Sequence, residues 1–258
     1  MEQEQASPQA TTAKESSAFS KLINVYVAPG EVFESIKVSP RKNALWAIPI
    51  TLTIIIGIFS TFLIFSDPVL VSQLTDQAEK GVQEAINQGR IPPDQADRAR
   101  EQAAGWVTGP FGKVMGIGGV VVFTFAGLFV VSLAMRLVGK TAFKATVPYG
   151  KVMEVVGASF MTNYVLGSIV TTLIILAMGS MYATPGLALL ISGFDPANKV
   201  HVLLSSVNIF SIWYLAVLSI GVGKLFGGST GKAAVWVVGL WIVWTLLTTF
   251  VLTFLRLG

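Results

Sequence analysis

The sequence predicts an all-α fold: a polytopic α-helical membrane protein with five transmembrane helices and an extramembrane α-hairpin between spans one and two. Hydrophobic residues make up 53% of the 258-residue chain, and charged residues make up only 12%. Soluble domains usually carry about 25% charged residues, and a soluble fold of this length could not bury so much apolar surface. The third observation is a set of apolar runs, each long enough to cross a bilayer as a helix.

The chain begins with a polar stretch, residues 1–20, which is rich in Gln, Ser, Ala and Thr and is predicted to be a disordered tail. Two short apolar segments follow, ended by Pro29-Gly30 and by Pro40. They are too short to cross a membrane and are predicted to lie on its surface. A cleavable signal peptide is not expected, because the first long apolar run starts only near Ala44 and no small-residue cleavage site closely follows it.

Residues 21–258 are predicted to form one membrane domain with five spans. The spans are expected at about 44–65, 114–137, 152–178, 200–226 and 233–255. The third run is longer than a bilayer requires, so it should be tilted or begin in the interface. Residues 186–194 are apolar but too few to cross, and they are predicted to lie at the interface.

The hydrophilic interlude, residues 66–113, is predicted to fold as a helical hairpin outside the membrane. Asp67 and Pro68 match an N-cap followed by proline at the first helical position. Apolar residues then recur at helical spacing until a break at residues 89–93. The interlude holds five basic and seven acidic residues, a formal charge of −2.

Basic residues near the ends of the spans predict the orientation, because cytoplasmic loops are enriched in Lys and Arg. One side of the predicted bundle carries nine such residues and the other side carries three. The nine are Lys37, Arg41, Lys42, Arg136, Lys140, Lys144, Lys151, Lys224 and Lys232. The N-terminal tail is therefore predicted in the cytoplasm, and the hairpin and the C-terminus outside.

Catalytic, cofactor-binding and metal sites are not predicted. The chain has no cysteine and a single histidine, His201, so thiol catalysis, disulfides and multi-histidine sites are excluded. The run GGSTGK at residues 227–232 lacks the Gly and the Ser or Thr that a phosphate loop requires where Phe226 and Ala233 stand. Nucleic acid is not an expected partner of this chain of net charge +4, because its basic residues flank apolar runs instead of forming one stripe.

Glu154 is the only acidic residue inside a predicted span. An ionisable group in a membrane costs several kcal/mol to insert and is a candidate functional residue for that reason. Glu154 lies within one turn of the predicted cytoplasmic end and three residues after Lys151, which favours an interfacial ion pair. A proton or cation site is the alternative.

A ridge of small residues on span two includes Gly112, Gly116 and Gly119, and the first two form a GxxxG pair. Glycines at these spacings let another helix approach closely. The ridge is predicted to pack against a helix of the same chain that carries polar residues, with dimerisation as the alternative.

Polar stripes are predicted on spans three and four, where they include Asn163 and Asn208. Both stripes should face into the bundle, because amides exposed to lipid would lack hydrogen-bond partners. A hydrogen-bonded core is one interpretation and a polar permeation path is the other. Trp213 falls near the middle of span four, away from the interfaces, and is predicted to pack internally.

The stretch from Val207, VNIFSIWYLAVLSIGVGKLFGGSTGKAAVW, resembles the fourth and fifth spans of the Yip domain family (Ypt/Rab-interacting proteins), especially its bacterial branch. The residues that carry the resemblance are Asn208, Phe210, Trp213, Gly221, Lys224, Ser229, Gly231, Lys232 and Ala233, with Pro29, Val32, Phe33, Ile36 and Pro40 ahead of span one. It implies a five-span domain with a cytosolic N-terminus, here in a bacterial cytoplasmic (inner) membrane. Eukaryotic relatives associate with small GTPases and with each other in vesicle trafficking.

The long polar hairpin and the short N-terminal tail depart from the trafficking members, which argues against small-GTPase binding by this chain. The leading functional hypothesis is a non-enzymatic membrane protein that organises partner proteins or the bilayer itself. Its partners would be the lipid bilayer and either further copies of itself or other membrane proteins. The alternative is a small-molecule permease, or a permease subunit, with a polar path near Asn163 and Asn208.

Overall fold

The structure is a computed structural model that describes residues 17–257 and, of these, the side chains of residues 17–250. Most of the predicted tail, residues 1–20, lies outside the described residues, and its last three residues begin helix α1. The described part of the chain contains α-helices, two short 3₁₀ turns and one π-helical segment, with no β-strand beyond an isolated bridge between Gly186 and Asn208.

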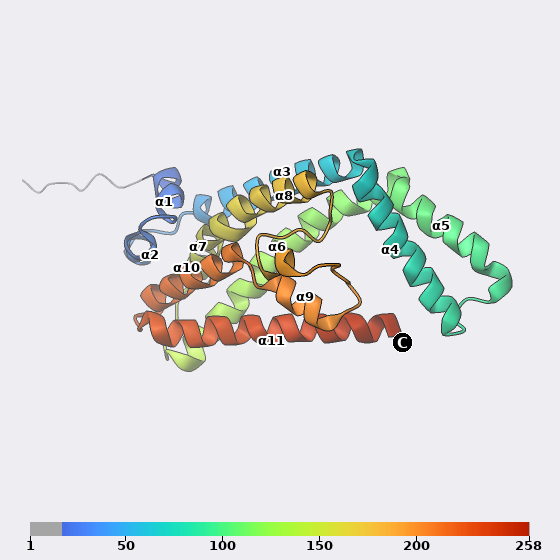
Figure 1. Ribbon diagram of the computed structural model, residues 1–258. Coiled ribbons are helices and arrows are strands. Elements are labelled where there is room, and N and C mark those ends of the chain that lie inside the picture. The colour runs from blue at the N-terminus through green and yellow to red at the C-terminus, as the bar shows by residue number, and fades with distance from the viewer. Residues whose placement is uncertain (1–16, 258) are drawn as a thin grey trace, which may run out of the picture.

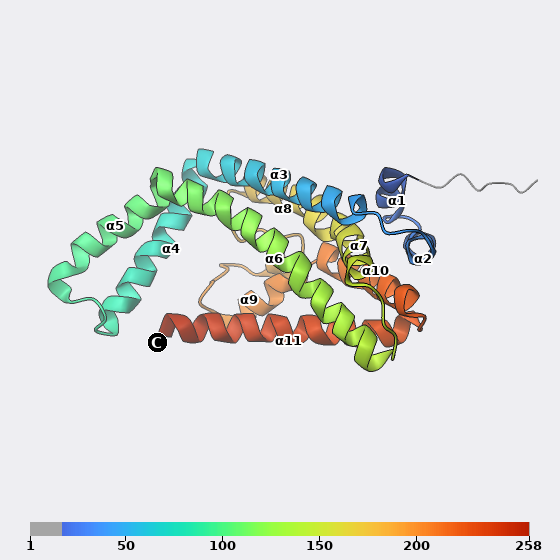
Figure 2. The ribbon, with the colours of Figure 1, turned by 180° about the vertical axis from the view of Figure 1, so that it is seen from behind.

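Five helices in the described residues are long and apolar enough to cross a membrane, which confirms the predicted all-α polytopic fold. They are α3 (Ala44–Ser66), α6 (Pro110–Ala142), the continuous stretch α7–η2–α8 (Tyr149–Met178), α10 (Ile209–Phe226) and α11 (Thr230–Leu257). Two of them, α3 and α11, run in a similar direction along opposite sides of the bundle (Figure 1). Seen from behind, α6 crosses the bundle diagonally, from α3 at one end to the start of α11 at the other (Figure 2).

Two short helices, α1 (Ala18–Asn24) and α2 (Pro29–Val38), lie at one end of the bundle (Figure 1). We call residues 18–39 the strap and this end of the bundle the strap end. The sequence predicted these segments on the membrane surface, but one face of the strap is packed into the bundle. Leu22, Val25 and Phe33 are at most 1% exposed, and removing such a side chain from water stabilises a fold by about 1.5–3 kcal/mol.

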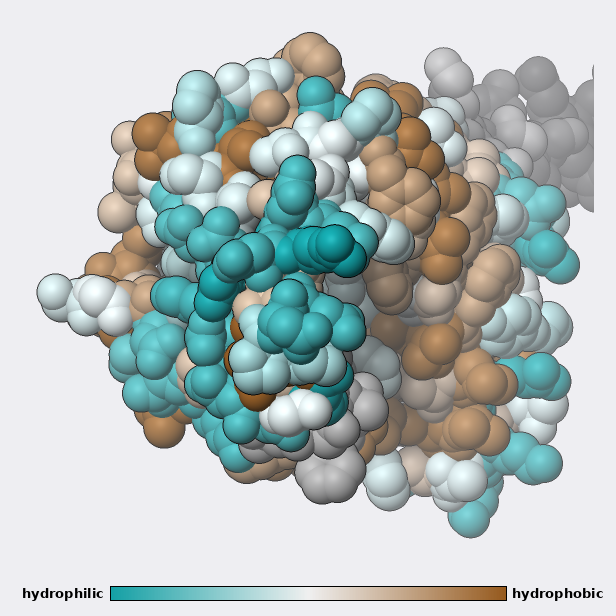
Figure 3. Space-filling model, turned by 90° about the vertical axis from the view of Figure 1, so that its right-hand side faces the viewer, coloured by the Kyte–Doolittle hydropathy of each residue, from teal (hydrophilic) through white to brown (hydrophobic). Residues whose placement is uncertain are grey.

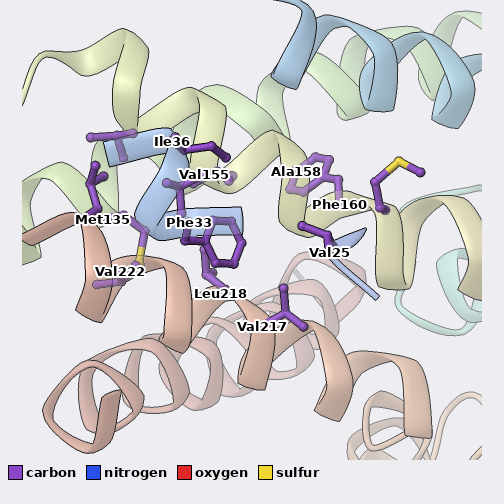
Figure 4. Packing of buried hydrophobic residues seen from close by; sticks show 14 of the residues in the cluster. Val25, Phe33, Ile36, Met135, Val155, Ala158, Phe160, Val217, Leu218 and Val222 are labelled. Carbon is purple, nitrogen blue, oxygen red and sulfur yellow. The ribbon is translucent and has the colours of Figure 1, made fainter. Parts of the chain in front are cut away.

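The strap contributes to a single apolar core that also takes in α3, α6, α7, α10 and α11. Figure 4 shows strap residues together with residues of α6, α7 and α10 in this core, among them Phe33, Ile36, Met135, Val155, Ala158, Phe160, Leu218 and Val222. Phe33 enters between α7 and α10, because α10 carries Gly221 there. A Cβ placed on Gly221 would lie 2.5 Å from Val155 and 3.1 Å from the Phe33 ring.

The predicted helical hairpin is formed by α4 (Pro68–Asn87) and α5 (Ala96–Thr108), with a 3₁₀ turn, η1 (Pro93–Gln95), between them. The Asp67 carboxylate accepts from the Val69 and Leu70 N–H groups at 2.8 and 3.2 Å, so the predicted N-cap is present. Figure 3 looks onto this end of the molecule, where hydrophilic residues gather, while hydrophobic residues cover the flank beside them. We call this the hairpin end.

The hairpin is fastened to the chain that follows span three. The Gln73 side chain donates to Gly179 O at 2.7 Å and accepts from Met181 N–H at 3.0 Å. Gln77, one turn further along α4, donates to the Tyr182 hydroxyl. The two glutamines thus tie α4 to the start of the segment that connects α8 to α9.

The structure differs from the sequence prediction in span four. The predicted span 200–226 is interrupted at Val207 and Asn208, which separate α9 (Lys199–Ser206) from α10. Asn208 caps α10 by accepting from Ser211 N–H at 2.9 Å, and Ser211 Oγ accepts from Asn208 N–H at 3.1 Å. Gly186 packs directly on the interruption, and Leu187 N–H donates to Val207 O at 3.2 Å. These backbone partners stabilise a break that a continuous apolar run does not reveal.

Candidate functional site

A buried carboxylate, Glu154, lies near the start of α7 at the strap end. Its side chain is fully buried, and it accepts from Lys151 Nζ at 2.9 Å and from Lys42 N–H at 2.6 Å. The ion pair predicted from the spacing of Lys151 and Glu154 is therefore present. Each carboxylate oxygen has one strong donor, which compensates the cost of burying the charge.

Lys151 extends this connection to the strap. Its ammonium also donates to Ile36 O at 2.7 Å and to Pro40 O at 3.3 Å. An ammonium has three donors, and here each has one acceptor. Ile36 belongs to the last turn of α2, where helix carbonyls attract positive charge. Glu154 and Lys151 together join α7, the end of α2 and the linker before α3, and we call this group the latch.

A second contact of the strap involves the π-helix η2 (Met161–Gly167), which joins α7 to α8. Tyr26, in the turn after α1, donates its hydroxyl to Met161 O at 2.6 Å. Burial raises the pKa of the Tyr26 phenol above its ordinary value, which keeps it in the neutral, donating form. Isolated π-helical turns occur frequently at functional sites. The sequence analysis did not predict this turn, because the apolar run of span three continues through it without a break.

Trp213 lies beside this contact. Its ring meets the Tyr26 ring at 5.6 Å and an interplanar angle of 62°, an edge-to-face geometry that aromatic pairs favour. Trp213 is half-buried and sits in the second turn of α10, so it packs on the strap as well as on the bundle. Tyr26 and Trp213 form, with the latch, the strap junction.

Asn163 and Asn208 do not form one polar path, because their side chains contact different parts of the bundle. Asn163 lies in the π-helix and is half-buried, with its amide oxygen next to Gly167. Asn208 is the N-cap of α10, and its side-chain oxygen is already engaged by Ser211 N–H. The predicted stripe on span four is interrupted at this cap, because residues before and after it belong to different helices.

The glycine ridge of α6 was predicted to pack against a helix that carries polar residues, but its neighbours differ from this prediction. A Cβ on Gly116 would lie 3.3 Å from Thr61 on α3, whereas Gly112 faces carbonyls of its own chain in α5 and Gly119 faces only Phe123 of its own helix. Of the three glycines only Gly116 packs on span one, and none of them packs on a helix with a polar stripe. Two serines of the polar stripes bond within their own helices: Ser159 Oγ donates to Val155 O at 2.8 Å and Ser219 Oγ donates to Leu215 O at 2.6 Å.

No three His, Asp or Glu side chains of residues 17–250 gather closely enough to hold a metal ion. His201 accepts from Asp195 N–H at 3.0 Å through Nδ1 and so stabilises the loop before α9. A cleft of about 320 Å³ lies on the hairpin, lined by Asp76, Glu79, Lys80, Gln83 and Arg100.

The chain was compared with models of protein families, with curated proteins and with solved structures. The model of the Yip1 domain family matches residues 23–252, from the strap to span five. Neither a curated protein nor a solved structure matches the chain. Three residues that carried the resemblance lie where the strap meets the bundle: Phe33 of the strap packs on Gly221, and Trp213 packs on Tyr26 of the strap. The chain, an integral multi-pass membrane protein, belongs to the Yip1 domain family.

Proposed function

We propose that this protein is a non-enzymatic membrane scaffold that organises partner proteins or the surrounding bilayer through its strap end. The observation that carries the proposal is the strap itself. Its inner face completes the apolar core, while its outer face leaves Phe19, Ile23 and Val27 exposed by 64%, 47% and 80%. These residues recur every four positions, so they form one stripe along α1 and the turn that follows.

The permease alternative gains no support from the residues on which it depends. A polar path near Asn163 and Asn208 needs side chains that are free to contact a solute. Asn208 instead caps α10, and bulky residues such as Phe33 and Phe160 fill the bundle at the level of the strap. These contacts favour the scaffold.

Site-specific photocrosslinking in cells tests the scaffold. A photoreactive phenylalanine analogue at Phe19 or Val27 should give discrete protein adducts. The matched control is the same analogue at Val243 on α11, which is 60% exposed and lies on an apolar flank that lipid should cover. Adducts that are absent from both strap positions, or equally abundant from Val243, would contradict the proposal.

We further propose that the strap end faces the cytoplasm and the hairpin the opposite side, because all nine of the basic residues on the predicted cytoplasmic side lie toward the strap end. Single cysteines can replace Gln88 on the hairpin and Ser229 between α10 and α11, since the chain has no cysteine of its own. An impermeant thiol reagent should label Gln88→Cys and not Ser229→Cys in intact cells. The reverse pattern would invert the orientation.

A further inference from the structure

A group of uncompensated positive charges lies at the strap end, around the last turns of α6. It consists of Arg136, Lys140, Lys144 and Lys232, which we call the basic rim; all four residues are exposed. Other lysines at this end pair with carboxylates: Lys37 and Lys224 with Glu34, and Lys151 with Glu154. Within residues 17–250 none of the four rim residues forms an ion pair with a carboxylate.

Two of the rim cations are held in place by aromatic rings. The Arg136 guanidinium lies 6.0 Å from the centre of the Tyr149 ring, and the Lys232 ammonium lies 5.0 Å from the centre of the Phe143 ring. Phe143 is itself fixed, because it stacks on Phe226 at 6.0 Å. Such contacts attract a cation to the ring face and leave its outer side available to an anion.

Lys144 adds an independent observation, a backbone conformation that lysine rarely adopts. Its φ is +54°, and it is the one non-glycine residue of the described chain with a positive φ. Ala145 N–H donates to Gly139 O at 3.1 Å and closes the end of α6 around it. Glycine is the usual residue at such a helix end, so a lysine here is strained, and strain of this kind concentrates at functional sites.

The rim also borders apolar surface. Leu133 and Leu137 are 51% and 53% exposed, and each precedes a rim residue of α6 by three positions. Residues three apart are neighbours on a helix. With 33 residues, α6 is about 50 Å long, longer than the roughly 30 Å hydrocarbon core. Its basic last turns can therefore lie among headgroups while the leucines face acyl chains.

We propose that the basic rim is a binding site for an anionic phospholipid, with the headgroup phosphate held by Arg136, Lys140, Lys144 and Lys232 and an acyl chain along Leu133 and Leu137. Basic clusters beside transmembrane helices attract anionic headgroups in this way. The exposed leucines select a lipid over a soluble phosphate. The inference deepens the bilayer-organising part of the proposed function and names the lipid class involved.

The test is thermal unfolding of the purified full-length protein in detergent. The rise in melting temperature on adding phosphatidylglycerol is compared with the rise on adding phosphatidylcholine. Phosphatidylglycerol should stabilise at lower concentration, and the difference should shrink as salt rises. Lys140→Gln and Lys232→Gln should each weaken phosphatidylglycerol binding about fivefold. Lys113→Gln is the matched control, because Lys113 is an exposed lysine at the opposite end of the same helix.

Lys144→Gly separates binding from folding. It removes a rim charge and at the same time places glycine where the backbone is left-handed, so the lipid-free protein should melt at the same or a higher temperature while phosphatidylglycerol binding weakens. Rim variants that bind like Lys113→Gln, equal stabilisation by phosphatidylcholine, or equal stabilisation by soluble glycerol phosphate would overturn the proposal. Because the assay needs no protein partner, its failure is distinguishable from a failure of the strap crosslinks.

Discussion

Glu154→Ala should lower the free energy of unfolding by about 3–5 kcal/mol, because it leaves a buried ammonium without its charge partner. The Lys151 side chain is only 11% exposed and the Glu154 side chain is fully buried. Lys42 N–H would lose its acceptor as well. The effect should appear as a large drop in the temperature of thermal unfolding in detergent.

Glu34→Ala is the control for this substitution. Glu34 pairs with Lys224 at 3.4 Å at the same end of the bundle, but its side chain is 48% exposed, and such pairs contribute about 0–1 kcal/mol. Replacing both partners, in Lys151→Met with Glu154→Leu, should cost less than Glu154→Ala alone, because no unpaired charge is then buried. A Glu154→Ala protein as stable as Glu34→Ala would show that the latch is not buried as described.

Gly157→Ala should cost about 1–3 kcal/mol through overpacking, although alanine normally favours helices. Gly157 lies where α7 crosses α3. A Cβ there would come within 2.5 Å of Trp46 Cα and 3.2 Å of Leu45 O, and backbone atoms cannot rotate away as a side chain can. The two helices would have to separate along the buried face of α7.

The control for Gly157 is Gly127→Ala in the middle of α6. A Cβ on Gly127 would meet nothing within 4 Å, so this change should be neutral or stabilise by up to about 1 kcal/mol. Thermal unfolding of both variants in detergent measures the contrast. Similar melting temperatures for the two would mean that α3 and α7 do not approach as closely as the structure shows.

The five-span fold was predictable because apolar length is a local property of the chain. Each crossing helix needs about 20 apolar residues, and the runs that begin near Ala44 and Lys113 show this directly. The hairpin was predictable for the same reason, since Asp67 and Pro68 mark its start. Local signals of this kind do not depend on what the helices later contact.

The break in span four was not predictable from hydropathy. Residues 200–226 read as one apolar run, and the interruption depends on Gly186, which reaches Asn208 from more than twenty positions away in the sequence. The partner of the glycine ridge escaped prediction because small residues show that a helix approaches but not which one. Gly116 meets Thr61, and its spacing alone could not have distinguished α3 from the other helices.

The candidate site was predictable only in part. The spacing of Lys151 and Glu154 indicated their ion pair, because residues three apart in a helix are neighbours. Their partners Lys42 N–H and Ile36 O are more than a hundred positions away and depend on where the strap lies. The strap segments were short and amphipathic, which suits a membrane surface as well as a groove between helices, so only the tertiary contacts show which of the two they adopt.

We expect the strap to be a fixed part of the bundle, held between spans three and four. A crosslink between positions 34 and 224 tests this arrangement, because Glu34 and Lys224 join the strap to α10 at 3.4 Å in a chain without cysteines. In native membranes of the variant with Glu34→Cys and Lys224→Cys, a short bifunctional thiol reagent should join the two positions within one chain, as peptide mass spectrometry would show. Two cysteines that each react separately, with no link between them in membranes or in detergent, would show that the strap is not held on α10.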